Sequence, residues 1–291
     1  MKILVTGAGG FIGSFLVKSL KKDKHQVCAA TRDILDFRDS EKVATFLEKN
    51  RFDVVLHTAA RGGRRTRADT AEDFYQNLLM FENLYMNKDK YSLMINFASG
   101  AEFGRTQNIN QAQTEDLYKI LPCDYYGASK NLIAKKILQT EDMVNLRIFN
   151  CFSEDELKDR MIRASCERHI NKAPIIVHQN KMMDFFYIED LYRVVQHYIK
   201  NFNSIILPRD LNLVYVEKVD LLSVAKTINS LTNHRVEIII NDEMSSGAYT
   251  GSGTKLEDLK INLLGLRLGV EHVYKTLRER RKYDESREQN I

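Results

Sequence analysis

Two residues suited to acid and base chemistry, Tyr126 and Lys130, are four positions apart, a spacing that places both side chains on one face of a helix. An ammonium group close to a phenol favours the phenolate and lowers a pKa that is ordinarily about 10. Such a tyrosine can donate or accept a proton during a reaction. The pair alone is weak evidence, because thirteen tyrosines in a lysine-rich chain give roughly one such pair by chance. It gains weight because it begins a predicted helix.

A serine at the end of a predicted strand could join this pair. Ser99 directly follows the apolar run Leu93 to Ala98, so its hydroxyl is expected at the carboxyl edge of a sheet. A serine at a strand end is by itself more often a turn residue. Together with Tyr126 and Lys130 it predicts a hydride-transfer site, in which Ser99 and Tyr126 polarise a carbonyl and Lys130 binds the ribose of a nicotinamide.

Glycines between the first predicted strand and the first predicted helix indicate where a dinucleotide would bind. In the segment Thr6 to Gly13 they let the backbone approach a pyrophosphate at a helix N-terminus. A glycine cluster alone is weak, since many tight turns need the same residues, but the strand-loop-helix position predicts dinucleotide binding. The cofactor contacts expected from this segment are Gly7, Gly10, Phe11, Ile12 and Gly13.

The end of the second predicted strand bears on the choice of dinucleotide. An acidic residue there would hold the adenosine ribose, but this strand ends at Ala30-Thr31 and Arg32 follows. An arginine can pair with a 2′-phosphate through two hydrogen bonds, which favours NADP over NAD, while Asp33 is a turn residue or a partner of the arginine. Asp36 could accept a hydrogen bond from the adenine amine. Phe37 could lie against the adenine ring or pack in the core.

An α/β architecture is needed to position these residues. Five apolar runs are typical of buried strands: Lys2 to Thr6, Gln26 to Thr31, Asp53 to Thr58, Leu93 to Ala98 and Met143 to Phe149. Between them, one helical face carries Phe11, Ile12, Phe15, Leu16 and Leu20, and another carries Leu132, Ile133, Ile137 and Leu138. Alternating strands and helices imply a doubly wound parallel sheet with right-handed crossovers.

After about residue 150 the order of elements is looser. Helices are expected at Asp155 to Asn171, Asp190 to Asn201, Val219 to Leu231 and Val270 to Arg281, with a strand at Val236 to Ile240. This half is expected to cover the carboxyl edge of the sheet. The run Arg61 to Arg67 follows the third strand and could contact a phosphate or stay solvated, whereas Arg278 to Arg287 is expected to be a solvated terminal helix.

The composition excludes several classes of protein. The 291 residues are 44% hydrophobic and 28% charged, as in globular proteins, and the net charge of +4 is small for a protein that neutralises nucleic-acid phosphates. No apolar run reaches the roughly 18 residues of a membrane span, and no signal-peptide core develops. Four cysteines without Cys-x-x-Cys spacing predict reduced, buried thiols, no metal site and a cytoplasmic location. We expect a small-molecule ligand, and no nucleic acid or membrane as partner.

In their order and spacing, these motifs resemble the extended short-chain dehydrogenase/reductase family. The matching segments are Thr6-Gly-x-x-Gly-x-x-Gly13, His57 to Ala60, Asn77 with Asn83, Ser99, Tyr126-Gly-Ala-Ser-Lys130, Leu146 to Asn150 and Asp184 to Asp190. The resemblance covers essentially the whole chain. It implies further cofactor contacts from Ala59, Ala60, Arg61 and Phe149, and substrate contacts from Ser99, Gly100, Tyr126 and Asn150. Asn150 could instead cap a loop.

The resemblance also implies an architecture and an assembly. Members have an NAD(P)-binding Rossmann domain, here residues 1–160, and a smaller C-terminal α+β substrate domain, here 161–291, of which about 184–215 returns to the Rossmann sheet. Most act as oxidoreductases on nucleotide-activated sugars, as epimerases, dehydratases or ketoreductases. The family pattern implies a homodimer through the helices near Thr70 to Asn87 and Tyr126 to Gln139.

Departures from the family pattern narrow the expected reaction. Sugar 4,6-dehydratases carry an Asp-Glu pair where this chain has Gly100 and Ala101, so dehydration lacks its acid and base. The 4-epimerases that retain NAD place an acidic residue at the position of Thr31. The segments Thr31 to Phe37 and Ala59 to Gly63 resemble GDP-L-fucose synthase, but the epimerising cysteine of that enzyme would fall at Ala101.

We therefore expect NADPH-dependent reduction of a nucleotide-linked 4-keto-6-deoxy sugar. Two alternatives stay open: a nucleotide-sugar epimerase or dehydratase with tightly bound NAD, and a non-catalytic dinucleotide-sensing protein. An arginine that often precedes the Asp-Phe pair and binds the diphosphate is replaced by Met183. If the substrate is a nucleotide sugar, the cations available for the diphosphate are Arg61, Arg64, Arg163, Lys181 and Arg209.

Overall fold

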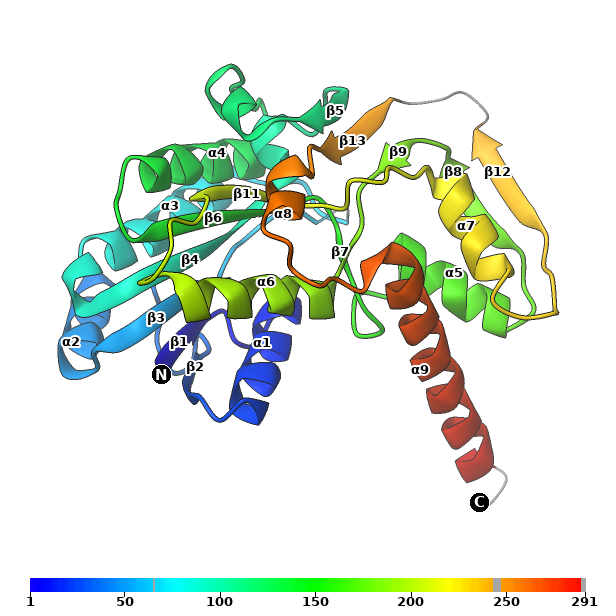
Figure 1. Ribbon diagram of the computed structural model, residues 1–291, viewed down its shortest axis with the longest axis horizontal. Coiled ribbons are helices and arrows are strands. Elements are labelled where there is room, and N and C mark those ends of the chain that lie inside the picture. The colour runs from blue at the N-terminus through cyan, green and yellow to red at the C-terminus, as the bar shows by residue number, and fades with distance from the viewer. Residues whose placement is uncertain (65, 243–246, 289–291) are drawn as a thin grey trace.

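A six-stranded parallel sheet forms the centre of the computed structural model, which describes residues 1–64, 66–242 and 247–288 (Figure 1). Its order is β11-β6-β4-β3-β1-β2, with β1 (Lys2–Thr6), β2 (Gln26–Ala30), β3 (Phe52–His57), β4 (Tyr91–Ser99), β6 (Met143–Ile148) and β11 (Asp210–Leu213). The five predicted strands are confirmed. The strand order reverses at β1, because β2 and β3 lie on opposite sides of it. A ligand crevice is expected at this switch point.

Helices cover both faces of the sheet, as the alternation of its buried residues requires. Ile3 and Val5 pack with α1 (Phe11–Lys22) and α6 (Ile188–Asn201). Leu4 packs in a second cluster with α2 (Ser40–Lys49), α3 (Ala71–Tyr85) and α4 (Tyr125–Leu138). The doubly wound α/β prediction is therefore confirmed. One predicted core residue is wrong: Leu132 is 41% exposed, because Ile133 and Ile137 define the buried face of α4.

The C-terminal lobe lies beside the carboxyl ends of the strands (Figure 1). Its helices are α5 (Met161–Ile170), α7 (Leu221–Asn229), α8 (Thr254–Asp258) and α9 (Gly265–Glu288). Its parallel strand pairs are β8 (Ile175–Gln179) with β12 (Ile238–Asp242) and β7 (Cys151–Phe152) with β10 (Phe186–Tyr187). A three-stranded sheet joins β9 (Met182–Met183), β13 (Ala248–Gly251) and β5 (Ile109–Ala112). The described part of the first half also contains the 3-10 turns η1 (Lys88–Lys90), η2 (Gly100–Phe103) and η3 (Thr114–Tyr118).

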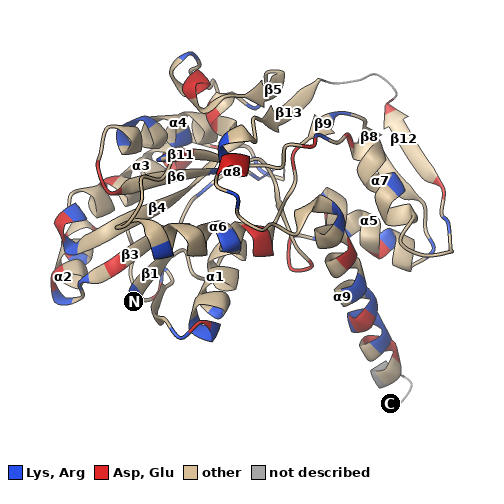
Figure 2. Cartoon of the chain, in the orientation of Figure 1, with Lys and Arg blue, Asp and Glu red and all other residues tan. Residues whose placement is uncertain are grey.

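Several bounds in this half differ from the predicted ones. The helix predicted from Asp155 begins only at Met161, because Arg160 has an extended backbone and the Ser153 hydroxyl accepts from the Asp155 amide to form a turn. The predicted helix Val270 to Arg281 is part of the longer α9, which carries the charged run predicted as a solvated helix (Figure 2). The chain returns to the main sheet through α6 and β11.

The cysteines are only partly as predicted. Cys151 and Cys166 are buried and Cys28 is half-buried, but Cys123 is exposed, because it lies in the loop before α4 rather than in an apolar strand or helix face. All four are free thiols. None of the helices in the described ranges has both the length and the apolar character to cross a membrane.

Candidate active site

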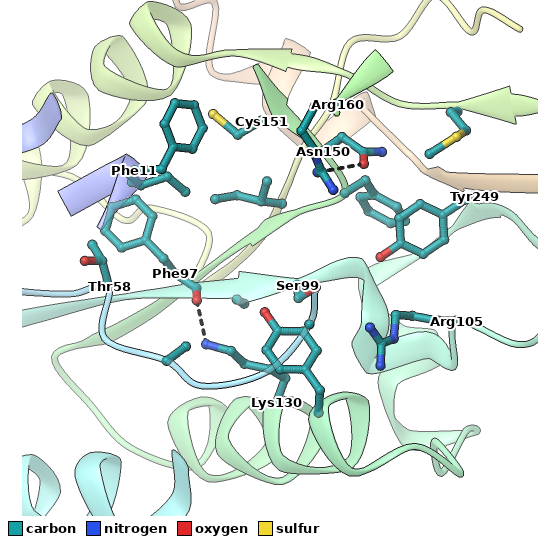
Figure 3. A pocket seen from close by; sticks show the side chains of 18 of the residues that line it. Phe11, Thr58, Phe97, Ser99, Arg105, Lys130, Asn150, Cys151, Arg160 and Tyr249 are labelled. Atoms are coloured by element: carbon teal, nitrogen blue, oxygen red, sulfur yellow. Dashed lines mark hydrogen bonds between the residues drawn. The ribbon is translucent and has the colours of Figure 1, made fainter. Parts of the chain in front are cut away.

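The predicted Ser-Tyr-Lys group is brought together at the carboxyl end of β4. Helix α4 begins at Tyr125 because the Asp124 carboxylate accepts from the Gly127 amide at 2.8 Å and caps the first turn. The Tyr126 ring then faces the end of β4, and Tyr126 and Ser99 line the same cavity. The Lys130 Nζ lies 5.9 Å from the centroid of the Tyr126 ring. Figure 3 shows Ser99 and Lys130 lining the same cavity.

Burial controls the charges of this group. Lys130 is 3% exposed, and desolvation lowers its pKa to about 8, although the Glu102 carboxylate raises it in part. Its Nζ donates to the Phe97 carbonyl at 3.0 Å (Figure 3). Burial raises the pKa of Tyr126, and the neighbouring Ser99 side chain offsets part of that rise. At neutral pH the phenol is therefore protonated and can act as a proton donor.

A glycine loop after β3 packs on the Tyr126 ring. Gly63 has a φ of +71°, and a Cβ atom there would lie 2.9 Å from the phenol Cζ. The Gly63 amide donates to Asp69 at 2.7 Å, and Asp69 in turn binds Arg105, whose guanidinium carbon lies 5.4 Å from the Tyr126 ring centroid. The sequence did not identify Arg105, because it belongs to a polar turn without a motif.

The predicted dinucleotide loop has the shape that a pyrophosphate requires. Gly7 has a φ of +63°, and a Cβ atom there would lie 2.8 Å from the Ala59 backbone. A Cβ on Gly13 would collide with the Gly7 carbonyl and lie 2.8 Å from the Thr58 hydroxyl. Helix α1 has no side-chain cap at Gly10, so its first amides remain available for an anion. These residues fit a dinucleotide, and Phe11 and Ile12 line the main cavity beyond them.

A cavity of about 450 Å³ lies beside this loop and reaches the end of β2. Arg32 and Asp33 are among the residues that line it. The Asp36 carboxylate receives two hydrogen bonds from Arg38 Nε, at 2.8 and 3.0 Å, and this hydrogen bonding lowers its pKa to about 2. Phe37 is 4% exposed, packs in the core and contributes to the cavity wall. Asp36 and Phe37 thus line the same cavity as Arg32, but Asp36 is already engaged with Arg38.

The alanine pair and Arg61 are held by the first strand and by α3. The Ala59 amide donates to the Thr6 hydroxyl at 3.2 Å, and the Arg61 amide donates to the Asn77 side chain at 2.7 Å. The Arg61 guanidinium pairs with Asp73 at 3.1 Å. Ala59, Ala60 and Arg61 all line the same cavity as Arg32. Within the Arg61 to Arg67 run, Arg65 lies outside the described residues.

The main cavity, of about 400 Å³, joins the two lobes. Phe149 lines it and packs against Tyr249 of the C-terminal lobe, with ring centroids 5.1 Å apart. Gly100 is buried beside both rings. The Asn150 side chain lies at the cavity wall, where its Nδ2 donates to the Asp184 carbonyl at 2.8 Å and its Oδ1 accepts from Arg160 at 3.3 Å (Figure 3). The Asn150 side-chain amide therefore links the segment of Asp184 to the segment of Arg160.

The cations expected near a substrate diphosphate are only partly in place. Lys181 lines the main cavity and a second cavity of about 490 Å³ next to it, whereas Arg64 is exposed on the loop after β3. Two expectations are wrong: Arg163 pairs with Glu167 at 2.8 Å, and Arg209 binds the Leu138 and Thr140 carbonyls at the amino end of β11, the opposite edge of the sheet.

Two arginines that the sequence did not single out line these cavities. Arg160 lines both cavities, and Arg168 lines the second one. Both belong to the segment around α5, where only a helical pattern was visible. Among the described residues, no group of histidine, cysteine and acidic side chains is placed to hold a metal ion.

The family comparison agrees with the fold and the site. Residues 3–213 match the NAD dependent epimerase/dehydratase family, and the chain belongs to this family. Its site is that of an NAD(P)-dependent enzyme of the extended short-chain dehydrogenase/reductase type.

Curated relatives cover much of the chain at low identity. An uncharacterised UDP-glucose epimerase of Bacillus subtilis, YtcB, is 23% identical over 282 residues, covering 84% of this chain and 86% of its own. The UDP-glucose 4-epimerase of Neisseria meningitidis is 30% identical over 184 residues, covering 51% and 52%. The ADP-L-glycero-D-manno-heptose-6-epimerase of Pseudomonas aeruginosa is 26% identical over 235 residues, covering 68% and 69%.

Solved structures share the fold over most of the chain. The GDP-mannoheptose C4 reductase of Campylobacter jejuni, with NADP bound, superposes with a TM-score of 0.79 at 18% identity, covering 94% of this chain and 97% of that one. The UDP-glucose 4-epimerase of Thermus thermophilus, in complex with NAD, superposes with a TM-score of 0.74 at 20% identity, covering 94% and 98%.

Proposed function

We propose that this enzyme reduces a nucleotide-linked 4-keto-6-deoxy sugar with NADPH. The observation that carries the proposal is the lining of the main cavity around Ser99 and Tyr126. Among the described residues that line it there is no aspartate, glutamate or histidine. Proton removal from a sugar carbon, which dehydration and 3,5-epimerisation require, then has no ordinary base. Hydride and proton transfer at one carbonyl is the chemistry that this lining supports.

Two acidic or basic side chains close to the site are unsuited to that proton removal. Glu102, next to Ala101, is fully buried and bound to Arg147 Nε at 2.6 Å. His57 is buried behind the alanine pair, and desolvation lowers its pKa to about 3. A ring with so low a pKa is a weak base, and it is already hydrogen-bonded to the Thr6 hydroxyl at 2.9 Å.

The residues of the site would divide the work of reduction. A bound nicotinamide would supply the hydride. Ser99 and Tyr126 would bind the carbonyl oxygen, and Tyr126 would give its proton to the alkoxide that develops there. Lys130 would hold the nicotinamide ribose and would favour the phenolate left on Tyr126 after transfer. Cover from the C-terminal lobe would exclude water and strengthen each of these interactions.

Arg32 supports NADP rather than NAD. Arg32 lies on the wall of the cavity of about 450 Å³ beside the glycine loop, which would hold the adenosine. Asp33 and Asp36 are the only acidic side chains among its described lining residues, and Asp36 is bound to Arg38. A 2′-phosphate at this place would meet a guanidinium rather than a carboxylate that binds ribose hydroxyls.

The second cavity supports a nucleotide-linked substrate. It continues from the main cavity past Arg160 and Lys181 to Arg168 and His178. Cations at the junction would pair with a diphosphate, and the space beyond would hold the nucleoside. Asp159, Ser165 and Gln179 are among the wall residues that could accept hydrogen bonds from a base.

The same site can support a 4-epimerase that keeps NAD bound, and similarity to the Neisseria meningitidis UDP-glucose 4-epimerase favours this second candidate. Such an enzyme returns the hydride to the same substrate, so it needs neither an exchanging cofactor nor a further base. The cofactor state of the purified protein distinguishes the two.

We also propose a homodimer in the cytoplasm. The outer faces of α3 and α4, which pack side by side, expose Tyr75, Tyr125 and Leu132 at 57%, 49% and 41%. A second copy would cover this apolar surface by forming a four-helix interface. Four free thiols favour a reducing compartment.

The test is calorimetric titration of purified protein with NADPH and with NADH, after its absorbance has been checked for bound dinucleotide. The reductase proposal expects an empty site and a clear preference for NADPH. Tightly retained NAD would replace it with the epimerase, and binding of neither dinucleotide would overturn both.

A further inference from the structure

Arg105 lies where three segments of the site meet: the turn after β4, the loop after β3 and the start of α4. It follows Ser99 by a short turn, in which Gly104 has a φ of +85° and its amide donates to the Ala101 carbonyl at 2.9 Å. The Arg105 side chain lines the main cavity, and Figure 3 shows it extending toward the side where Ser99 and Lys130 lie. Arg105 therefore belongs to the site, although it is no part of the Ser-Tyr-Lys group.

The loop after β3 covers the Tyr126 ring with two glycines. Gly62 and Gly63 have φ values of +86° and +71°. A Cβ atom on Gly62 would lie 3.4 Å from Tyr126 Cδ2, and one on Gly63 would lie 2.9 Å from Tyr126 Cζ, so the loop can approach the phenol this closely only without side chains. The Asp69 carboxylate accepts from the Gly63 amide at 2.7 Å and holds the loop in this position.

The helix that carries Tyr126 is held by a second aspartate. Asp124 Oδ1 accepts from the Gly127 amide at 2.8 Å and caps the first turn of α4. The same oxygen accepts from Arg105 Nη2 at 2.6 Å. The other carboxylate oxygen of Asp124 is buried and has no hydrogen-bond partner among the described residues. Arg105 is therefore the cation that offsets the charge of this helix cap.

One nitrogen of Arg105 joins the two aspartates. Its Nη2 donates to the Asp69 carboxylate as well as to Asp124. Within the described ranges no other cation forms an ion pair with either carboxylate. The Asp69 side chain is only 6% exposed, so water screens little of its attraction to the guanidinium. The loop over the ring and the cap of the helix are thus linked through a single guanidinium nitrogen.

The guanidinium also lies beside the ring that the loop covers. Its carbon is 5.4 Å from the Tyr126 ring centroid, and the Lys130 Nζ is 5.9 Å from the same point. Burial raises the pKa of Tyr126, the Glu102 and Asp69 carboxylates add to this rise, and Arg105 opposes it. Loss of Arg105 would therefore free the loop and also leave these carboxylates less compensated.

We propose that Arg105 is a positioning residue for the reaction, which joins the loop over the Tyr126 ring to the cap of α4 and so holds the phenol at the cavity wall near Ser99. Without this link the loop and the first turn of the helix would move independently, and Tyr126 would lose the orientation from which it gives its proton to the substrate oxygen. The inference rests on the proposed role of Tyr126 as proton donor. The position and the ionisation of Tyr126 can be measured without cofactor or substrate, so a failure here is distinct from a failure of the proposed reaction.

Amide hydrogen exchange, followed by NMR in the free protein, measures the link itself. Arg105→Met removes both ion pairs and keeps the apolar stem. It is expected to speed the exchange of the Gly63 and Gly127 amides about tenfold, which corresponds to the loss of roughly one hydrogen bond. Arg209→Met is the matched control, because Arg209 donates to two carbonyls at the other end of the same helix, and it should leave both amides unchanged.

Protein labelled with 3-fluorotyrosine gives a signature that general loosening of the fold does not produce. The fluorine signal of Tyr126, assigned by Tyr126→Phe, is followed during a pH titration, and fluorine beside the hydroxyl lowers the phenol pKa toward an accessible range. Arg105→Met is expected to raise the midpoint by about one to two units, the effect of a unit charge about 5 to 6 Å away at an effective dielectric constant of about 20 to 40. Arg105→Lys keeps the charge and should recover about half of this change or more.

Two results would overturn the proposal: unchanged exchange of the Gly63 and Gly127 amides in Arg105→Met, or equal acceleration in Arg209→Met. An unchanged midpoint in Arg105→Met would do the same, and if wild type does not titrate while folded, the amide exchange decides alone. Should Arg105→Met fail to fold, Asp69→Asn takes its place, because it keeps an acceptor for the Gly63 amide but loses the ion pair. Exchange of Gly63 should then still rise, and unchanged exchange would overturn the proposal.

Discussion

Replacement of Arg147 by methionine tests the support beneath Ser99. Arg147 is fully buried, and its guanidinium binds Glu102 at 2.6 Å, Asp210 at 2.9 Å and the Asn212 side chain at 2.9 Å. The Glu102 carboxylate accepts from the Ser99 amide at 3.3 Å, so the ion pair also fixes the start of η2. The variant keeps the apolar stem but leaves two buried carboxylates without their cation.

The expected loss in the free energy of unfolding at pH 7 is about 3 to 5 kcal/mol, the cost of removing one partner from a buried pair. Burial already raises the pKa of Glu102 above its ordinary value, and loss of Arg147 would raise it further. A carboxyl group with a raised pKa in the folded state takes up its proton more readily there than in the unfolded chain. The deficit should therefore shrink as the pH falls toward 5.

Urea denaturation at pH 7 and pH 5 measures both effects. Arg280→Met is the matched control, because Arg280 pairs with Asp155 on the surface and its loss should cost no more than about 1 kcal/mol. A loss below about 1 kcal/mol in Arg147→Met, or a loss that does not depend on pH, would refute this reasoning.

Four further outcomes follow from the site. Arg32→Ala should weaken NADPH binding about tenfold or more in calorimetry and leave NADH unchanged, because a charge-assisted hydrogen bond to the 2′-phosphate is lost; equal effects on both would contradict this. Gly13→Ala should abolish dinucleotide binding in the same assay, since its methyl group would collide with the Gly7 carbonyl; unaltered affinity would show that this loop is not the cradle. Cofactor affinity of wild type should fall as the pH rises through about 8, where Lys130 loses its proton, and Lys130→Met should flatten this profile; a decline that persists in the variant would assign it elsewhere. Leu132→Glu should convert the proposed dimer to a monomer in sedimentation experiments, and a sedimentation coefficient equal to that of wild type would rule out the α4 interface.

The sheet and the convergence of Ser99, Tyr126 and Lys130 on one cavity could be predicted because the signals are local. Strands such as Lys2–Thr6 are short apolar runs bounded by glycine or charge, and Tyr126 and Lys130 are one helical turn apart. The glycine loop needs only its neighbours to define a tight turn. Each of these features depends on a few consecutive residues, so sequence pattern identifies them.

The remaining features depend on contacts between distant segments. Tyr249 lines the main cavity only because β13 joins β5 and β9, pairings that no local pattern predicts. Arg209 looked available for a phosphate, yet it caps carbonyls at the opposite sheet edge. Asp36 has a nearer partner in Arg38, two residues away, than the adenine assigned to it.

The most direct test of hydride transfer to a carbonyl uses NADPH deuterated at the transferable position of its nicotinamide. The protein is incubated with this cofactor and a panel of GDP-linked and UDP-linked 4-keto-6-deoxy sugars, and the products are analysed by mass spectrometry, with Tyr126→Phe as control. A reductase yields a product that has gained one deuterium and one proton, with matching formation of NADP⁺, and Tyr126→Phe yields far less of it. An isomer of unchanged mass with the label left in the cofactor would contradict net reduction, and full turnover by Tyr126→Phe would contradict the role of the phenol.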